Sequence, residues 1–399
     1  MHLQSDICII GNGAVGKAAA LGFAQAGLGV TLVGHAAPAA AVADWDLRVY
    51  ALNHVAHALL SSLRVWDALD AARVAPVDAM QVYGDGAQAA GSHAGQLGFD
   101  AYGARVGALA WIVEDSNLNQ ALDAALKFAA KVRCVQASAT AIETAGAAAQ
   151  VALDNGDTIG AELLVGADGG QSWVRGQCEI GIDYRSYGQR AVVANFECAH
   201  PHRGVAHQWF AGEQGIVALL PLPGQRVSLV WSAPENLAEA LLHETPQQLA
   251  QRLAVWAAPV LGDLRPLPPP ERKAFPLALI RPHAIVAPRV ALVGDAAHVI
   301  HPLAGHGMNL GFADVAALLT QVAGRGPQVD CGDARVLRRY ARARKEDILA
   351  MQMTTDGLAR LFGSEFEPVR KMRNLGLNLL DRIPALKRRL ISHALGRLP

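Results

Sequence analysis

A glycine-rich turn between a short strand and a helix constrains the fold of this chain more than any other feature. Residues 6–10 read DICII, an apolar run typical of a buried parallel strand. The turn GNGAVG follows at residues 11–16, residues 17–26 have the composition of a helix, and a second strand is expected at residues 30–33. This order predicts the opening of a doubly wound α/β unit.

The spacing of the turn suits a pyrophosphate. Gly11 permits the tight turn, Gly13 lets a phosphate approach the backbone, and Gly16 lets the helix pack on the strand. The helix N-terminus adds unpaired N–H groups that bind phosphate oxygens. A purely structural glycine turn has the same spacing, but the position between a strand and a helix favours a dinucleotide site.

One part of such a site is absent. An acidic residue usually ends the second strand and binds the adenosine ribose, whereas here Val33 is followed by Gly34 and His35. Because a charged hydrogen bond is worth about 1.5–3 kcal/mol, we expect weaker cofactor binding than usual and expect Gly34→Glu to strengthen it. Asp44 and Asp46 are candidates to replace the missing acid.

Two later strands also end in Gly/Asp turns. Residues 162–165 lead into GADGG at 166–170, and residues 289–293 lead into GDAAH at 294–298. Because ligands of open α/β sheets bind at the carboxyl ends of the strands, we expect the three turns to converge on one ligand. A new helix is expected to begin within residues 304–309, with amides and a positive dipole end suited to an electron-rich ring edge.

The segment between the second and third turns has a different pattern. Residues 189–197, 207–210, 215–221 and 226–232 are expected as strands of an antiparallel sheet. We therefore expect three regions: a discontinuous α/β domain (1–75, 100–178 and 284–334), an inserted β lobe (76–99 and 179–283) and a C-terminal helical region (335–399).

Composition excludes several classes of protein. The 35 basic and 35 acidic residues cancel, so no global positive field exists to bind a nucleic acid. The five cysteines form no CxxC pair, which favours a reduced, cytoplasmic compartment without a zinc site. The long uncharged stretches, 18–43 and 296–313, are interrupted by glycine and proline, so neither is expected to span a membrane. The first residues lack the basic start of a signal peptide.

The chain resembles the class A flavoprotein aromatic hydroxylases, and within them the ubiquinone-biosynthesis (2-polyprenylphenol) hydroxylase branch. The resemblance covers nearly the whole chain. It rests on GNGAVG at 11–16, DLRVYALN at 46–53, WIVEDSNL at 111–118, GADGGQSWVR at 166–175, YGQRAVVANF at 187–196, LLPLPGQRVSLVWS at 219–232, GDAAHVIHPLAGHGMNLGFAD at 294–314 and RNLGLNLLDRIPALKRRL at 373–390.

The resemblance implies an FAD-binding Rossmann-like domain of the glutathione-reductase type with the β lobe as substrate lobe. It implies cofactor contacts from Gly11, Gly13, Ala14, Val15 and Gly16 to the pyrophosphate, from Arg48 near the flavin, from Asp168 in a motif serving FAD and nicotinamide, from Asp295 to the ribityl or pyrophosphate part, and from Leu303, Ala304, Gly305, His306, Gly307, Met308 and Asn309 along the pyrimidine edge of the flavin. It assigns no catalytic side chain. Two positions depart from the family, Gly34 at the ribose acid and His306 at a usual glutamine.

The implied activity is that of an FAD-dependent monooxygenase. It would hydroxylate a lipophilic, polyprenylated phenol in ubiquinone biosynthesis, with NAD(P)H and dioxygen as co-substrates and a flavin C4a-hydroperoxide as oxidant. Two alternatives stay open: a hydroxylase of another aromatic compound, and a flavin-poor scaffold in a ubiquinone-biosynthesis assembly. The resemblance and the basic, amphipathic residues 386–391 also leave open contact with the inner face of the membrane or with a multi-enzyme complex.

Several side chains have two interpretations. His298, His301 and His306 could together bind a metal, but the absence of acidic ligands between them favours packing or hydrogen bonding. For His306 we expect the backbone of residues 302–309 to matter more than the imidazole. Core packing is favoured over a substrate pocket for Trp209, Phe210 and Trp231. The cationic residues Arg335, Arg338, Arg339, Arg342, Arg344 and Lys345 are expected to form one solvated helix face.

Overall fold

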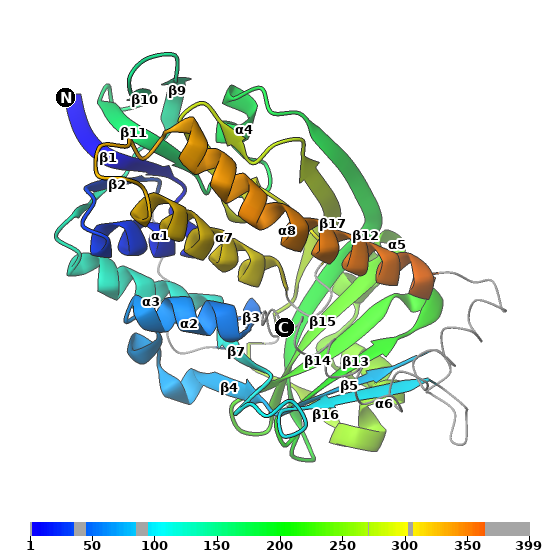
Figure 1. Cartoon of the computed structure of the whole chain (residues 1–399). Coiled ribbons are helices and arrows are strands. Elements are labelled where there is room, and N and C mark those ends of the chain that lie inside the picture. Colours follow the sequence, from blue (N-terminus) through cyan, green and yellow to red (C-terminus); the bar gives the residue numbers. More distant parts are fainter. Residues whose placement is uncertain (1, 36–44, 85–94, 270, 302–305, 364–399) are drawn as a thin grey trace.

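The computed structural model describes residues 2–35, 45–84, 95–269, 271–301 and 306–363. Its first sheet contains a parallel core flanked by antiparallel strands (Figure 1). The order is β18 (Val286–Ala287), β19 (Val290–Leu292), β11 (Thr158–Gly166), β1 (His2–Ile10), β2 (Val30–Val33) and β8 (Val132–Val135), with β10 (Ala149–Leu153) on β11 and β9 (Ala139–Glu143) on β10. The expected strands before all three turns are therefore present.

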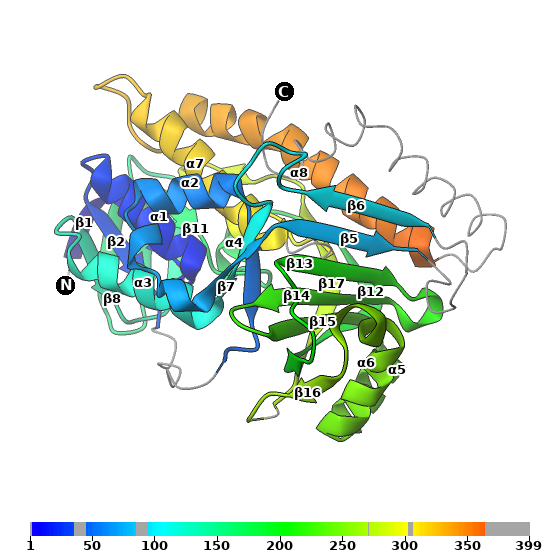
Figure 2. The ribbon, with the colours of Figure 1, turned by 90° about the horizontal axis from the view of Figure 1, so that it is seen from below.

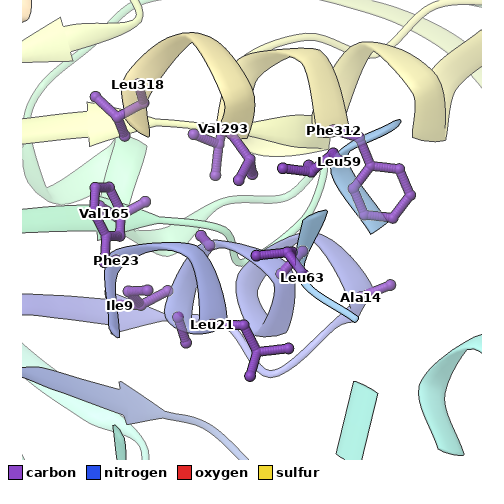
Figure 3. Close-up of a cluster of buried hydrophobic side chains, with 14 of the residues drawn as sticks. Ile9, Ala14, Leu21, Phe23, Leu59, Leu63, Val165, Val293, Phe312 and Leu318 are labelled. Carbon is purple, nitrogen blue, oxygen red and sulfur yellow. The ribbon is translucent and has the colours of Figure 1, made fainter. Parts of the chain in front are cut away.

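Helix α1 (Ala14–Gln25) lies on the parallel strands and packs against α7 (His306–Ala323). Helix α3 (Asp115–Lys127) packs on α1, while α2 (His54–Ser62) and α8 (Ala334–Gly363) pack on α7. The core lies between the parallel strands and the pair α1 and α7. Figure 3 shows Ile9, Val165 and Val293 of the strand layer facing side chains of these helices, among them Phe23 and Phe312. This packing fixes the helix N-termini at the carboxyl edge of the sheet.

The second sheet forms the β lobe (Figure 2). Its order is β16 (Leu264–Pro266), β12 (Ile182–Cys198), β15 (Arg226–Pro234), β14 (Ile216–Leu222), β13 (Val205–Phe210), β5 (Ala79–Tyr83) and β6 (Gln96–Asp100), while β17 (Lys273–Pro282) pairs with β12. Helices α5 (Glu235–His243) and α6 (Pro246–Leu261) bury one face of the sheet against Val192, Phe196 and Trp231. Trp209 also lies in this core and Phe210 in a smaller one, so the packing interpretation of these aromatic residues is confirmed.

Two further features join the sheets. A three-stranded sheet, β3 (Val49–Leu52), β7 (Ala110–Glu114) and β4 (Val74–Val77), leads into the lobe strands. Helix α8 packs on α7 and then crosses the ends of β12 and β17, where Asp356 pairs with Arg185 and Gln352 with Arg281 (Figure 1). The short helix α4 (Trp173–Gln177) follows the second turn.

The expected architecture is confirmed, with one correction in α8. Arg344 does not belong to the solvated face: its side chain is only 4% exposed and pairs with the buried Asp314. Arg335, Arg338, Arg339, Arg342 and Lys345 are exposed as expected. Residues 364–399 of the expected C-terminal helical region lie outside the described residues, and the three-region division stays a prediction.

Candidate FAD site

The three turns meet at the carboxyl edge of the first sheet. The carbonyl oxygen of Ala167 would lie 2.2 Å from a Cβ placed on Gly11, and Val15 lies 3.3 Å from a Cβ placed on Gly294. A Cβ on Gly311 of α7 would meet the same valine at 2.9 Å. The first and second turns are therefore in backbone contact, and the third turn packs against Val15 of the first, so the three turns meet as predicted. That they bind one ligand stays a prediction. Gly311 belongs to the quoted third-turn motif, but its packing role was not predicted.

The first turn is shaped to receive a ligand. Gly11 has φ +122°, a conformation that favours glycine, and a Cβ on Gly16 would lie 2.0 Å from the carbonyl oxygen of Gly11. A Cβ on Gly13, in contrast, meets no atom of the described residues within 4 Å. Gly13 is the N-cap of α1 and supplies no side chain to cap it. The first amides of α1 therefore have no side-chain cap, and the space beside Gly13 is open among the described residues, as a pyrophosphate requires.

The end of β2 explains why an acid does not fit there. Gly34 has φ +151°, and a Cβ on it would lie 3.0 Å from both the backbone nitrogen and the Cβ of Asn12. The side-chain amide of Asn12 donates to the His35 carbonyl, and the His35 imidazole contacts the Ser138 hydroxyl at 3.1 Å. This geometry opposes the gain expected from Gly34→Glu, because any side chain at residue 34 strains the turn. The effect of the substitution on cofactor binding stays a prediction.

Asp295 and Arg48 are oppositely charged residues that interact electrostatically near the third turn. Asp295 lies in the turn after β19 and is exposed, yet burial of the surrounding site raises the pKa of its carboxyl, against the lowering effects of His298 and Arg48. The pKa of Arg48 is also raised, chiefly by Tyr50, against the effect of burial and with further contributions from Asp115 and Asp295. An exposed carboxylate in a poorly solvated surrounding is suited to accept hydrogen bonds from ligand hydroxyls.

The backbone that carries Arg48 is fixed by hydrogen bonds. The Arg48 amide donates to Asp46 Oδ1 at 2.9 Å, and the Asp46 amide donates to Oε1 of the buried Glu114 at 2.5 Å. Arg73 makes two hydrogen bonds to the same glutamate, at 2.6 and 2.9 Å. Asp46, considered above as a ribose acid, instead accepts from the Arg48 and Ser116 amides. Asp44 lies outside the described residues.

Two predicted contact residues already have partners. Asp168 accepts from the Ser172 hydroxyl at 2.5 Å and from the Val174 amide at 2.9 Å, so it fixes the start of α4. Asn309 accepts from the Asn53 amide at 2.9 Å and donates to the Ala51 carbonyl at 2.8 Å. These bonds position the second turn and α7, and cofactor contacts from the two side chains stay predictions.

The other predicted residues lie at the start of α7. A Cβ on Gly307 would meet no atom of the described residues within 4 Å, and Met308 packs against the main core. Leu303, Ala304 and Gly305 lie outside the described residues, and the His306 side chain is not described.

The histidines of the third turn point to different partners. The Nε2 atom of His298 lies 2.6 Å from Oδ2 of Asp314, while the Nε2–H of His301 donates to Oε1 of Gln189 over 3.1 Å. Burial lowers the pKa of His301 to about 4, so its imidazole is neutral. Within the described ranges no group of three or more His, Cys, Asp or Glu residues could hold a metal.

Asp314 is a residue that sequence reasoning missed. It is fully buried and also accepts from Arg344 Nε at 2.7 Å and from the Gly294 amide at 2.9 Å. Burial opposes its ionisation, but His298 and Arg344 together lower the pKa of the carboxyl. The cluster ties the third turn to α7 and α8. The sequence shows that Asp314 and Arg344 carry opposite charges, but it does not show that two residues so far apart in the chain form a pair.

Comparisons with known proteins agree with this site. The family described as FAD binding domain matches residues 4–353. The chain is 37% identical to 3-demethoxyubiquinol 3-hydroxylase of Escherichia coli K12, over 98% of both chains. It is 35% identical to ubiquinone hydroxylase UbiL of Rhodospirillum rubrum, over 99% of this chain and 90% of the relative.

Solved structures show the same fold. The p-nitrophenol 4-monooxygenase PnpA from Pseudomonas putida superposes with a TM-score of 0.77 at 16% identity, covering 100% of this chain and 99% of PnpA. PqsL of Pseudomonas aeruginosa, solved with 2-aminobenzoylacetate, gives 0.76 at 22% identity over 94% of this chain and 99% of its own. With the glycine turns and the sequence relatives, these matches show that the chain belongs to the FAD-binding family of flavoprotein monooxygenases.

Proposed function

We propose that this chain hydroxylates the ring of a polyprenylated phenol in ubiquinone biosynthesis. The observation that carries the proposal is that the three Gly/Asp turns meet at the carboxyl edge of the first sheet, beside the uncapped N-terminus of α1. The named hydroxylase relatives support the substrate class, because they match over nearly the whole chain.

The residues present fit FAD. The amides of Ala14, Val15 and Gly16 at the start of α1 would bind the pyrophosphate, and Asp295 would accept from the ribityl hydroxyls. Arg48 would supply positive charge near the flavin ring. Bound FAD supplies the two-electron chemistry that passes reducing equivalents from NAD(P)H to dioxygen.

The protein supplies position and exclusion of water. The face of the β-lobe sheet opposite α5 and α6 includes Val193, Val230 and Ala218, paired across three neighbouring strands. An apolar surface of this kind suits a lipophilic ring and favours displacement of water from it.

The test combines the colour of the protein with product analysis. The chain purified after expression should be yellow or bind added FAD, and should oxidise NAD(P)H faster when a prenylated phenol is present. Product formed under isotopically heavy dioxygen should carry the label in the new hydroxyl group. A colourless protein that ignores added FAD would favour the scaffold alternative. Flavin binding without labelled product would favour another aromatic substrate.

A finer proposal concerns location. We propose that the protein works in the cytoplasm against the inner face of the membrane or within a multi-enzyme complex, because its substrate is lipophilic and residues 386–391 are basic and amphipathic. Within the residues that the structure describes, none of the helices is long and apolar enough to cross a bilayer. Co-sedimentation with anionic vesicles should fall when Lys387, Arg388 and Arg389 are replaced by glutamine.

A further inference from the structure

Strand β12 contacts the FAD site at two places. Residues Val192, Ala194 and Phe196 point into the core under α5 and α6. Residues 189, 191, 193 and 195 alternate with them, so they face the FAD-binding side. The ends of this row, Gln189 and Asn195, carry the polar side chains.

Asn195 reaches the segment that carries Arg48. Its Nδ2 donates to the carbonyl oxygen of Asp46 over 3.0 Å, and Oδ1 of Asp46 accepts from the Arg48 amide. The guanidinium of Arg48 also lies 5.8 Å from the ring centre of Phe275, on the neighbouring strand β17. The β lobe therefore contacts both the backbone beside Arg48 and the side chain of Arg48 itself.

Gln189 reaches the segment that leads into α7. Its Oε1 accepts from Nε2–H of His301, which is fully buried and directly precedes Pro302. Beside this bond, the backbones of Ile280 on β17 and Val299 form an antiparallel bridge. The neutral state of His301 leaves one ring N–H, and that N–H is used by Gln189.

The row between the two anchors is apolar and buried. Ala191 and Val193 are each 6% exposed, and six residues of strand span about 20 Å. We propose that Asn195 and Gln189 are positioning residues for FAD, which set the spacing between the Arg48 segment and the third turn. The inference rests on the proposed function only for the identity of the ligand.

The test compares Asn195→Ala and Gln189→Ala with Ser228→Ala. Ser228 lies directly opposite Asn195 on β15, is fully buried, and its hydroxyl has no partner among the described residues. Each variant is titrated with FAD in the absence of substrate, well below its unfolding temperature. Hydrogen exchange of the peptide that spans residues 45–53 is measured in the apo-protein.

We expect Asn195→Ala to raise the dissociation constant for FAD about tenfold, which corresponds to about 1.4 kcal/mol, and to speed exchange at Asp46 and Arg48. Gln189→Ala should raise the constant by a similar factor without changing exchange at residues 45–53. Ser228→Ala should change both quantities less than twofold. With a prenylated phenol, the two positioning variants should lose product formed per NAD(P)H oxidised while KM for the phenol stays near its original value.

Unchanged FAD affinity in both variants, or an equal loss in Ser228→Ala, would overturn the proposal. Failure of the proposed function would look different. In that case the FAD and exchange results would hold, and the original protein itself would form no hydroxylated phenol.

Discussion

At the scale of single residues, two glycines of the first turn have different roles: Gly13 leaves space for the cofactor, and Gly16 is required for the packing of the turn. A methyl group on Gly13 would meet no described atom within 4 Å, whereas one on Gly16 would lie 2.0 Å from the Gly11 carbonyl oxygen. We therefore expect Gly13→Ala to keep the stability of the apo-protein and to raise the dissociation constant for FAD at least tenfold. Gly16→Ala should lower the free energy of unfolding by about 2 kcal/mol or more, because the turn and helix must move apart.

Urea unfolding of the apo-proteins and FAD titrations measure the two effects separately. Gly176→Ala is a matched control, because a Cβ there also meets nothing within 4 Å but lies in α4. Loss of FAD affinity in the Gly176 variant as large as in Gly13→Ala would contradict a specific role of the first turn.

Asp295 gives a second prediction at this scale. Burial raises the pKa of its carboxyl, so the folded apo-protein disfavours the charged form. Such an acid lowers stability at every pH above its folded pKa, and the loss begins as pH rises past the unfolded value. Asp295→Ala should therefore leave the thermal midpoint of the apo-protein at pH 7 unchanged or higher. FAD affinity should fall about 10- to 100-fold, because charged hydrogen bonds are worth about 1.5–3 kcal/mol.

Spectrophotometric FAD titration and thermal melts at pH 5 and 7 measure both parts of this prediction. The stability difference in favour of the variant should be larger at pH 7 than at pH 5. A variant that melts lower than the original apo-protein at both pH values would show that Asp295 supports the fold rather than the cofactor.

At the scale of secondary-structure elements, α7 and α8 are joined by the buried pair Asp314 and Arg344. Arg344→Met leaves that carboxylate in contact with the imidazole of His298 and the Gly294 amide. Breaking a buried pair from one side costs about 3–5 kcal/mol, and urea unfolding at pH 7 should show a loss of this order. Arg339 of the same helix is exposed, so Arg339→Met should change the free energy of unfolding by less than about 0.5 kcal/mol.

The pH dependence follows from the lowered pKa of Asp314. A carboxyl with a lowered folded pKa contributes stability above its unfolded pKa, and this contribution is lost as pH falls through the folded value. The original protein should therefore lose stability more steeply than Arg344→Met as the pH falls below about 4. Parallel acid-unfolding curves for the two proteins would contradict the assignment.

Hydrophobic periodicity and turn residues predicted the strands and helices, but they did not predict which side chains pair between elements. The run at residues 30–33 and the Gly/Asp turns gave strands at the expected places, because local pattern determines a buried strand and its end. The sequence did not distinguish the buried Arg344 from the exposed cationic residues of α8, because its partner Asp314 on α7 lies 30 residues away in the chain. The strain at Gly34 depends on Asn12 across the turn, which no local pattern shows.

At the scale of the whole molecule, α8 connects the FAD-binding side with the β lobe. Its first half contacts the end of β19 through Tyr340, whose hydroxyl donates to the Leu292 carbonyl at 2.7 Å. Its second half contacts the lobe at Arg185 and Arg281. FAD at 100 times its dissociation constant stabilises the folded protein by about 2.7 kcal/mol. We expect part of that stabilisation to reach the lobe through these contacts of α8.

We predict that FAD slows hydrogen exchange in both β11 and β17 of the original protein. In the double variant Arg185→Met and Arg281→Met, protection of β11 should persist, while the FAD-dependent protection of β17 should fall at least threefold. Arg252→Met is the control, since it breaks an ion pair with Glu244 among the outer helices without touching α8. Because β17 also contacts Val299 through its backbone, a double variant with undiminished protection of β17 would mean that the backbone bridge, and not α8, carries the coupling.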